Sequence, residues 1–491
     1  MSRPHGLSKS RFTSGLQCHR QLWWRVHERD APELVPDPAQ QALFDQGSRV
    51  GEVARGYVPG GTLIALPYDA FQGKLAATQR ALATDTPAIY EASFLADDVF
   101  VAVDILARET RGWRVIEVKS STSVKAEHLS DAAIQVHVVR RAGVPVTGAD
   151  VMVLNRECTF PDLGNLFKRT DVTNLVEDLL PDIPGLVRAQ MAMLAGPLPT
   201  VAVGPHCEAP YECPFMSRCW PERPAHHVGT LYFMKSFAAG FEAQGWRTLF
   251  DLPEGKATNP QANRQCRSVR AGRMLVEGDL AGALGRFEGP LAFLDFETVG
   301  PAIPVWNGCR PYDQVPVQFS CHAETAGGAM AHHAWVAEGP GDPRPEIARR
   351  LIEACRGART VVAYNAPFEK SCLKRMAEAL PDLAPALYDI IARLADPLPV
   401  VREHVYHPDF GGSFSLKAVL PALVPELSYA GLTIADGGAA ALALTRLVMA
   451  GDGIAEPERA ATREALMRYC KVDTLAMVKV LERLRELANG P

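Results

Sequence analysis

The chain has 491 residues, 47% of them hydrophobic and 22% charged. This balance excludes extensive disorder, and the length predicts several domains because single cores stop growing at about 250–300 residues. A net charge of −5 excludes the strongly basic character of a chromatin-type protein, so nucleic-acid binding would have to be local.

The chain starts with a basic stretch, MSRPHGLSKSRF, that has no apolar segment behind it. No run of about 18 apolar residues occurs elsewhere, so the sequence predicts neither export nor a membrane partner, and we expect a cytoplasmic protein. Basic residues around Trp23 and Trp24 indicate either a local nucleic-acid contact or the solvated face of a first helix. These basic residues are Arg3, Lys9, Arg11, Arg20, Arg25 and Arg29.

Residues 1–222 are predicted to form a first domain, in which helical patterns precede a block of strand formers. Residues 88–121 cluster Val, Ile, Phe and Trp around the turn signals ADD and ETRG, which predicts three consecutive strands. AEHLSDAAIQVHVVRRAG then has helical spacing, and ADVMVLN returns to strand character. We therefore expect the order strand, strand, strand, helix, strand.

Two of these predicted strands carry acidic residues. Asp104 lies on one strand, and Glu117 and Lys119 share one face of the next, so a turn brings all three together. The two carboxylates can hold a metal while the ammonium stabilises a nucleophilic water or the charge that develops at phosphorus. The alternative is a hairpin with surface salt bridges.

With Gln135 on the following helix, this pattern resembles the PD-(D/E)XK nuclease core, in particular its RecB-like branch. The resemblance implies a restriction-endonuclease-like fold in which Asp104 and Glu117 bind metal and act in catalysis with Lys119. It also implies supporting roles for Gln135 and for Glu91, which lies where a further acid often precedes the core.

The chain departs from the RecB-like pattern at two positions. Relatives commonly show G-x-x-x-H in the first helix and Q-x-x-x-Y after the core. This chain has Gly51 in place of the histidine and Val139 in place of the tyrosine. An inactive nuclease fold that only grips DNA is therefore the alternative for this domain.

PHCEAPYECPFMSRCW spaces three cysteines six residues apart in a proline-rich loop, a pattern too irregular for a buried helix face. With one early cysteine they form a four-thiolate set suited to zinc or to an iron–sulfur cluster. The set is Cys18, Cys207, Cys213 and Cys219. The layout also resembles iron–sulfur RecB-like nucleases, including CRISPR-associated ones, and so implies a [4Fe-4S] cluster that joins the two ends of the domain. The other cysteines mostly fall in apolar runs and are predicted to be core residues.

Residues 223–288 show short helical segments and no clear strand, which predicts a helical adaptor. Residues 289–491 start with the strand patterns LAFLDFE, VPVQFSCH, HHAWVAE and TVVAYN and continue with mainly helical ones. Strands first and helices later predict an α/β layer fold with a mixed sheet.

The run LAFLDFETVG places Asp295 and Glu297 at the end of a strand that should be buried. Residues i and i+2 of a strand share a face, so the two acids would project into one small volume. Two like charges so close share a proton or hold a divalent cation such as Mg²⁺. The alternative is that the strand ends here and both acids are solvated.

Two further motifs follow. In VVAYNAPFEKSCL, a strand runs into Asn365 and Pro367, with Glu369 in the first turn of the next helix. Ligands gather at such strand ends in open α/β sheets. In MRYCKVDTLAMV, Tyr469 and Asp473 lie four residues apart on one face of a helix. Each motif alone is compatible with ordinary surface chemistry.

In this order, D-x-E, N-x-x-F-E and Y-x-x-x-D resemble the three exonuclease motifs of the DnaQ-like DEDD exonucleases, which have a ribonuclease-H-like fold. The resemblance covers roughly residues 288–485, and it implies that Tyr469 positions the attacking water. Glu369 departs from the aspartate usual in the second motif, and Asp389 lies where a supporting acid often occurs. The implied ligands of two Mg²⁺ or Mn²⁺ ions are Asp295, Glu297, Glu369 and Asp473. Of these, Asp295, Glu297 and Asp473 are also implied to act in catalysis.

The whole layout resembles bacterial predicted RecB-family nucleases that join such a domain to a ribonuclease-H-like one. We therefore expect a metal-dependent nuclease with two sites that acts on DNA in repair or defence and trims 3′ ends at the C-terminal site. The alternatives are a nucleic-acid-binding scaffold with a degenerate nuclease site and an exonuclease that processes RNA. Protein partners leave no signal in the sequence.

Overall fold

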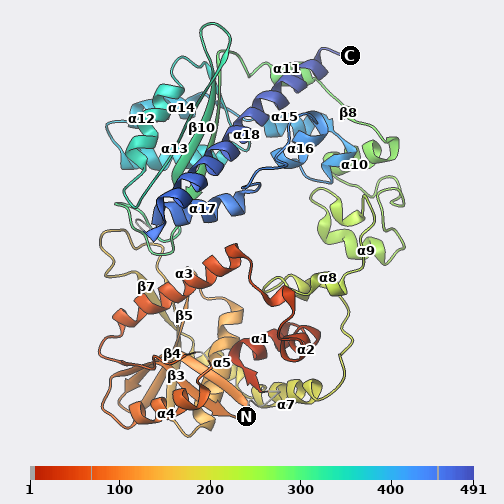
Figure 1. The fold of residues 1–491 in the computed structure, drawn as a ribbon. Helices are drawn as coiled ribbons and strands as arrows, with labels where there is room; N and C mark the ends of the chain where they lie inside the picture. Colours follow the sequence, from red (N-terminus) through yellow and green to blue (C-terminus); the bar gives the residue numbers. More distant parts are fainter. Residues whose placement is uncertain (1–5, 68, 450–452, 491) are drawn as a thin grey trace. The chain divides into compact units, whose positions relative to one another are not determined.

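The computed structural model describes residues 6–67, 69–449 and 453–490, so Arg3 lies outside the described part. The chain divides into two compact units, residues 1–221 with 301–312 and residues 222–300 with 313–491. Each unit combines a mixed sheet with helices, which confirms the predicted α/β multi-domain class (Figure 1). Among the described residues, no helix is both long and apolar enough to cross a bilayer.

The first unit is built on a seven-stranded sheet in which β2 to β7 follow in chain order and β1 pairs with β4. β3, β4 and β5 form an antiparallel meander, and β6 runs parallel to β5 because helix α5 crosses between them. The predicted order of three strands, a helix and a strand is confirmed. The strands are β1 (Leu7–Ser8), β2 (Thr62–Leu63), β3 (Ala88–Ala96), β4 (Val99–Glu109), β5 (Gly112–Lys119), β6 (Val146–Leu154) and β7 (Phe167–Asp171).

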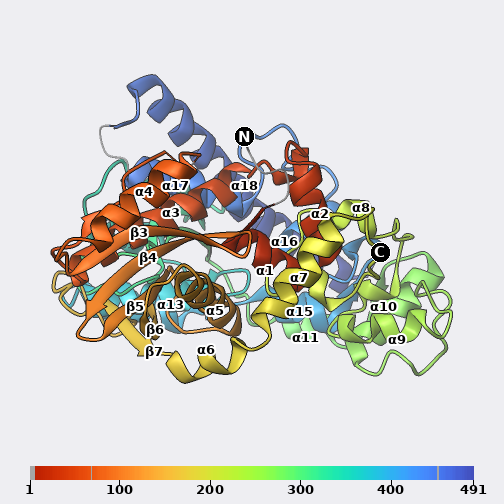
Figure 2. The same cartoon turned by 90° about the horizontal axis from the view of Figure 1, so that it is seen from below.

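Helices cover both faces of this sheet. Val115 of β5 packs in the core that contains Val136 of α5, whereas the neighbouring Ile116 packs with Ala54 of α3. Figure 2 shows α3 and α5 on opposite sides of β3 and β4. The helices of this unit are α1 (Lys9–Gln17), α2 (His19–His27), α3 (Pro38–Ala54), α4 (Phe71–Leu82), α5 (Ala126–Arg141), α6 (Thr173–Leu179), α7 (Ile183–Leu194) and α8 (Met216–Cys219).

The second unit contains a five-stranded sheet in the order β11-β10-β9-β12-β13. The first three strands are antiparallel, while β12 and β13 run parallel to β9, so the predicted mixed sheet is confirmed. The strands are β9 (Leu291–Val299), β10 (Val315–Glu324), β11 (Met330–Val336), β12 (Thr360–Val362) and β13 (Leu394–Ala395).

Alternation along β9 divides the core of the second unit. Leu291 and Phe293 pack on the side of α18, and Ala292 and Leu294 pack on the side of α12, α13 and α14. The long helix α18 lies along β9 and β10 (Figure 1). The helices of this part are α12 (Arg344–Ala354), α13 (Pro367–Ala379), α14 (Ala384–Ala392), α15 (Pro397–His404), α16 (Leu416–Leu423), α17 (Gly437–Met449) and α18 (Glu456–Ala488).

The predicted adaptor, residues 223–288, lies within the second unit. It is mainly helical, with α9 (Ala238–Glu242), α10 (Pro260–Ala271) and α11 (Leu280–Leu284). The sequence pattern missed one short strand, β8 (Leu275–Val276), which pairs with β14 (Val405–Tyr406). Two residues are too few to show a period of two.

A short segment between β9 and β10, residues 301–312, packs with the first unit. The Phe160 amide donates to the Cys309 carbonyl at 2.9 Å, and the Tyr312 hydroxyl donates to the Ser120 carbonyl at 2.7 Å. The range predicted for the C-terminal domain, residues 289–491, thus contains a segment that folds with the first unit.

Candidate metal centres

β9 directs Asp295 and Glu297 to the side of the sheet that α18 covers, because they continue the odd-numbered series begun by Leu291 and Phe293. The strand does not end at these acids but runs on to Val299. Both pair with residues of β10 within the ladder. The alternative of two solvated acids beyond a strand end is therefore wrong.

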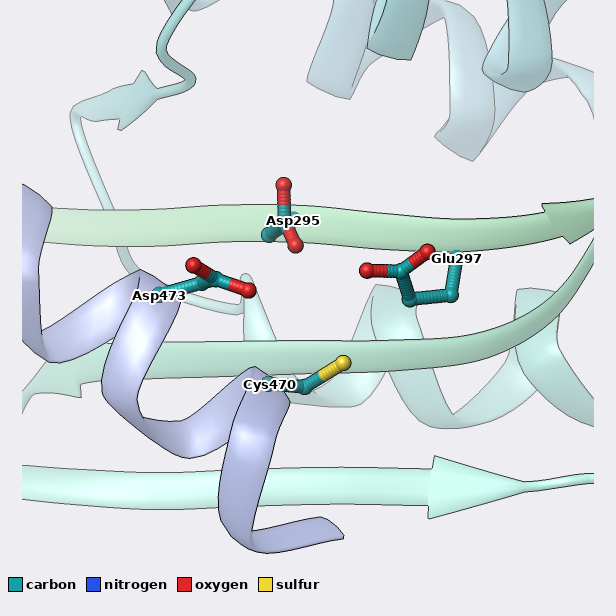
Figure 3. Close-up of side chains that lie close together, drawn as sticks. All are labelled: Asp295, Glu297, Cys470 and Asp473. Carbon is teal, nitrogen blue, oxygen red and sulfur yellow. The ribbon is translucent and has the colours of Figure 1, made fainter. Parts of the chain in front are cut away.

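Helix α18 brings Cys470 and Asp473 against this face of β9. Ligand atoms of Asp295, Glu297, Cys470 and Asp473 all lie within 4.8 Å of one another, and the side chains face one another in Figure 3. Cys470 and Asp473 are three residues apart, so they share a helix face. The sequence placed Cys470 among the core cysteines, and it is indeed buried, but it also borders the acids.

The cluster is electrostatically costly without a cation. Burial, followed by the Asp473 carboxylate, raises the pKa of Glu297 to about 8, and the Lys417 ammonium opposes this rise. Burial, followed by Asp473 and Glu297, raises the pKa of Asp295 well above its usual range. Burial and mutual repulsion therefore favour the protonated forms of these carboxyl groups, and a bound cation would favour the charged forms.

Glu369 occupies the first turn of α13, as the sequence predicts, and only 4% of its surface is exposed. It lies outside the four-residue group but close enough to raise the pKa of Asp295. Burial raises the pKa of Glu369 itself to about 7. Its Oε2 is buried and has no hydrogen-bond partner among the described residues, so this oxygen can accept a ligand.

The sequence missed the residue that holds the turn in front of Glu369. Asp396 accepts hydrogen bonds from the backbone amides of Asn365 and Ala366 at 3.0 and 3.1 Å. Asn365 has a φ of 68°, a left-handed conformation that asparagine tolerates better than most residues. This capped turn directs the start of α13, and with it Glu369, toward β9.

Tyr469 is buried beside the acids, and two neighbours that the sequence missed complete its surroundings. The Lys417 ammonium donates to the Tyr469 hydroxyl at 2.9 Å and lies over the rings of Tyr469 and Tyr429. The Tyr429 hydroxyl donates to Asp473 Oδ1 at 2.6 Å. Lys417 and Tyr429 are close to the site only through tertiary packing, so no local pattern marks them.

Asp389 does not join the cluster. It lies on α14 with an exposed side chain and accepts a hydrogen bond from Arg393, four residues on, at 2.7 Å. Such a pair is an ordinary feature of a helix surface.

The residues of the second unit fit divalent cations. Three acidic side chains with hard oxygen atoms converge, burial and mutual repulsion raise the pKa values of Asp295 and Glu297, and one oxygen of the nearby Glu369 is buried without a partner among the described residues. Within the described residues, none of the four forms a salt bridge with a lysine or arginine. Asp295, Glu297, Glu369 and Asp473 are the side chains that would hold the ions.

The first unit brings Asp104, Glu117, Lys119 and Gln135 together, as the sequence predicts. An irregularity in the sheet contributes. On a regular strand, residues an odd number apart point to opposite faces. Val103 and Leu106 are three residues apart, yet both pack in the core on the α5 side. The alternation along β4 therefore shifts by one residue near Asp104. Asp104 accepts a hydrogen bond from the Val118 amide at 2.7 Å, and burial raises the pKa of Asp104.

Glu91 lies opposite Asp104, between the paired residues Tyr90 and Ala92 of β3. It has a φ of 60°, an uncommon conformation for a side chain of this size. Its carboxylate pairs with Arg55 at 3.0 Å rather than with the central lysine.

Glu117 is enclosed by positive charge. Its carboxylate contacts Lys119 at 2.8 Å, Gln135 at 2.5 Å and, at 2.7 and 3.0 Å, Lys9. Although burial opposes the shift, Lys9 and Lys119 lower the pKa of Glu117. Lys119 also binds Asp131. The sequence analysis did not identify Asp131, and it noted Lys9 only as one of several basic residues near the start of the chain. Because Lys9 contacts the buried Glu117, it is not part of a solvated helix face.

All four predicted cysteine ligands line one cavity. The cavity lies between α2 and the loop around α8, where Trp24 also packs against Phe215 with ring centroids 5.0 Å apart. Burial raises the pKa of the Cys219 thiol, Arg20 lowers it, and the other three sulfurs raise it further. The two ends of the first unit thus meet at these thiols, which are Cys18, Cys207, Cys213 and Cys219.

The surroundings of this cavity fit a negatively charged group. The Nε atoms of Arg20 and Arg25 are buried and have no hydrogen-bond partner among the described residues. A tetrahedral zinc site with Zn–S bonds of about 2.3 Å needs sulfurs about 3.8 Å apart. Within the described part of the chain, no three of these sulfurs all lie within 4.8 Å of one another.

A family model described as a domain of unknown function, DUF2779, matches residues 292–415. The matched segment includes Asp295, Glu297 and Glu369 and ends before Tyr469 and Asp473. It covers 124 of the 491 residues, about a quarter of the chain. Among curated proteins, none matches this chain.

Proposed function

We propose that the protein is a metal-dependent nuclease that hydrolyses phosphodiester bonds in DNA. In this proposal the second unit is a ribonuclease-H-like DEDD domain with a 3′–5′ exonuclease site. The first unit is a RecB-like PD-(D/E)XK domain that holds a [4Fe-4S] cluster, as in the RecB-family proteins that the sequence resembles.

The observation that carries the proposal is the convergence of Asp295, Glu297 and Asp473 in one partly buried group with a partnerless oxygen of the buried Glu369 nearby. These residues come from β9, α13 and α18, which are distant in sequence. Burying so many acids is unfavourable unless cations neutralise them. A chain that only needed stability would place apolar side chains there.

Bound divalent ions would stabilise the attacking and leaving oxygens of an in-line phosphoryl displacement. The chain's own residues have separate tasks. Tyr429 fixes the orientation of Asp473 by donating to one of its oxygens. Lys417 donates to the Tyr469 hydroxyl, and this hydroxyl hydrogen-bonds to Asp473, so Tyr469 also helps to position that acid.

Cleavage of end-labelled nucleic acids tests this function. Protein purified without oxygen is incubated with single- and double-stranded DNA and RNA in Mg²⁺ or Mn²⁺. Asp295→Asn should reduce 3′ trimming at least 100-fold, and the matched control Asp389→Asn should retain it. If Asp295→Asn trims like the unmodified protein, the site assignment is wrong.

One observation favours a second candidate for the first unit, a nucleic-acid-binding domain without cleavage. Two lysines form salt bridges with the Glu117 carboxylate. Their positive charges can balance this carboxylate without a metal ion. If Lys119→Met leaves every cleavage product unchanged but weakens DNA binding, the first unit is a binding domain. A preference for RNA ends would assign the second unit to RNA processing.

A further inference from the structure

Lys9 has a fixed place beside the acids of the first unit. It is the first residue of α1, directly after β1, and β1 pairs with β4 through Leu7 and Val99. β4 carries Asp104. Only 24% of the Lys9 side chain and 1% of the Glu117 side chain are exposed. Lys9 is therefore built into the site rather than part of a solvated start of the chain.

The hydrogen bonds of Glu117 leave no room for a further ligand. A carboxylate offers about four lone-pair sites. Lys9 fills two of them, and Lys119 and Gln135 fill one each. A divalent ion can bind Glu117 only if one of these donors leaves.

Lys9 is the donor whose departure would free most of the site. Lys119 has a second acidic partner, Asp131, and Gln135 also donates to the Asp131 carbonyl. Both hydrogen bonds that Lys9 makes through its side chain, among the described residues, go to Glu117. An oxygen that could bind the ion already lies on Gln135, which contacts Glu117. Gln135 Oε1 is fully buried and has no hydrogen-bond partner in the described part of the chain.

We propose that Lys9 occupies Glu117 as an internal cation and competes with a divalent ion for it. The first unit then binds an ion only when Lys9 releases the carboxylate. This inference rests on the proposed function in one respect, since that function indicates that the ion is divalent. The inference itself concerns ion binding and does not require cleavage. It also distinguishes the first unit from the second, where the nearby Lys417 donates to Tyr469 and a backbone carbonyl instead of a carboxylate.

Binding of Mn²⁺ alone tests the competition. The titration follows the electron paramagnetic resonance signal of free Mn²⁺. All proteins are full-length and carry Asp295→Asn and Asp473→Asn, so that the second unit does not bind the ion. Lys9→Met keeps most of the length of the side chain and removes its charge. It should increase Mn²⁺ affinity at least tenfold over the background, and Lys9→Arg should not. Lys168→Met, at an exposed lysine of β7, is the matched control.

Glu117→Gln in the Lys9→Met protein should abolish the gained affinity, because the ion would lose its freed carboxylate. If Lys9→Met binds Mn²⁺ no more tightly than Lys168→Met, or if the gain survives Glu117→Gln, the competition does not exist. Lys9→Gln gives the same comparison if Lys9→Met fails to fold. A protein that never cleaves nucleic acid would refute the proposed function and leave this titration intact.

Discussion

Glu369 shows how the metal-free second unit should respond to pH. Its pKa is about 7 in the folded protein, above the ordinary value of 4.5. A carboxyl whose pKa is raised by folding contributes stability below pH 4.5, and this contribution is lost as the pH rises through about 7. The buried Glu369 carboxylate without a partner is therefore a cost above neutral pH.

Glu369→Gln should remove this cost in protein treated with a chelator. We expect the variant to be more stable at pH 8 by on the order of 3 kcal/mol, and nearly unchanged at pH 4, because the glutamine does not ionise. Urea unfolding at both pH values measures the difference. Asp389→Asn is the control at an exposed acid. An identical pH profile for Glu369→Gln and the unmodified protein would show that Glu369 does not titrate in this way.

Tyr429→Phe removes a single hydroxyl from the acidic cluster. Without its donor at 2.6 Å, the Asp473 carboxylate is no longer held in one orientation. Losing such an outer partner commonly weakens metal binding or activity by about 10- to 100-fold. We expect Mn²⁺ affinity to fall about tenfold by calorimetric titration. Tyr388→Phe, at an exposed tyrosine, should leave it unchanged, and equal affinities for both variants would contradict the assigned role.

At the scale of elements, a buried polar network fixes how α18 lies on the sheet. The Thr474 hydroxyl contacts Ser320 of β10 at 2.8 Å and His322 at 2.8 Å. Thr474 directly follows Asp473, so the same contacts set the position of that acid. All three polar residues are buried.

Thr474→Val keeps the shape of the side chain but leaves these partners unsatisfied. We expect a loss of about 1–3 kcal/mol in the free energy of unfolding, measured by urea denaturation. Thr445→Val, at an exposed threonine of α17, should change it by less than about 0.5 kcal/mol. Equal effects of the two changes would show that the network does not hold α18.

Elements with a clear period were predictable from the sequence, and irregular ones were not. The alternation in β9 predicted that Asp295 and Glu297 share a face, and helical spacing did the same for Tyr469 and Asp473. The two-residue strand β8 and the segment 301–312 leave no such pattern, because tertiary contacts alone place them.

The same limit applies to the residues around each site. A motif can be read where its members lie on one strand or helix, as with Glu117 and Lys119. Lys9 and Glu117 are more than a hundred residues apart, and Tyr429 reaches Asp473 from a separate loop. Such partners become visible only when the chain is folded.

At the scale of the whole molecule, the chain has three places suited to inorganic groups, each with a different charge. Among the described residues, the acidic cluster of the second unit forms no salt bridge with a lysine or arginine, Glu117 of the first unit has two lysines, and Arg20 lines the cysteine cavity. Under the proposals made above, these differences correspond to divalent ions, a competing lysine and an anionic cluster, respectively.

The iron content of the purified protein tests the proposal for the cysteine cavity of the first unit. Protein purified without oxygen should be brown and contain about four iron atoms per chain, as a [4Fe-4S] cluster requires. Cys213→Ser should lose the colour and the iron, whereas Cys158→Ser should keep both, because Cys158 lies outside the cavity and donates to the Asp162 carbonyl. Zinc in place of iron would contradict the proposed cluster and assign these thiols to a zinc site.

The location of bound Mn²⁺ tests the central claim most directly. Crystals of the full chain grown with Mn²⁺ would be measured for anomalous scattering. We predict at least one peak bonded to carboxylate oxygens of Asp295, Glu297 and Asp473. A map with no peak among these three side chains, at a Mn²⁺ concentration that supports any cleavage, would contradict the account.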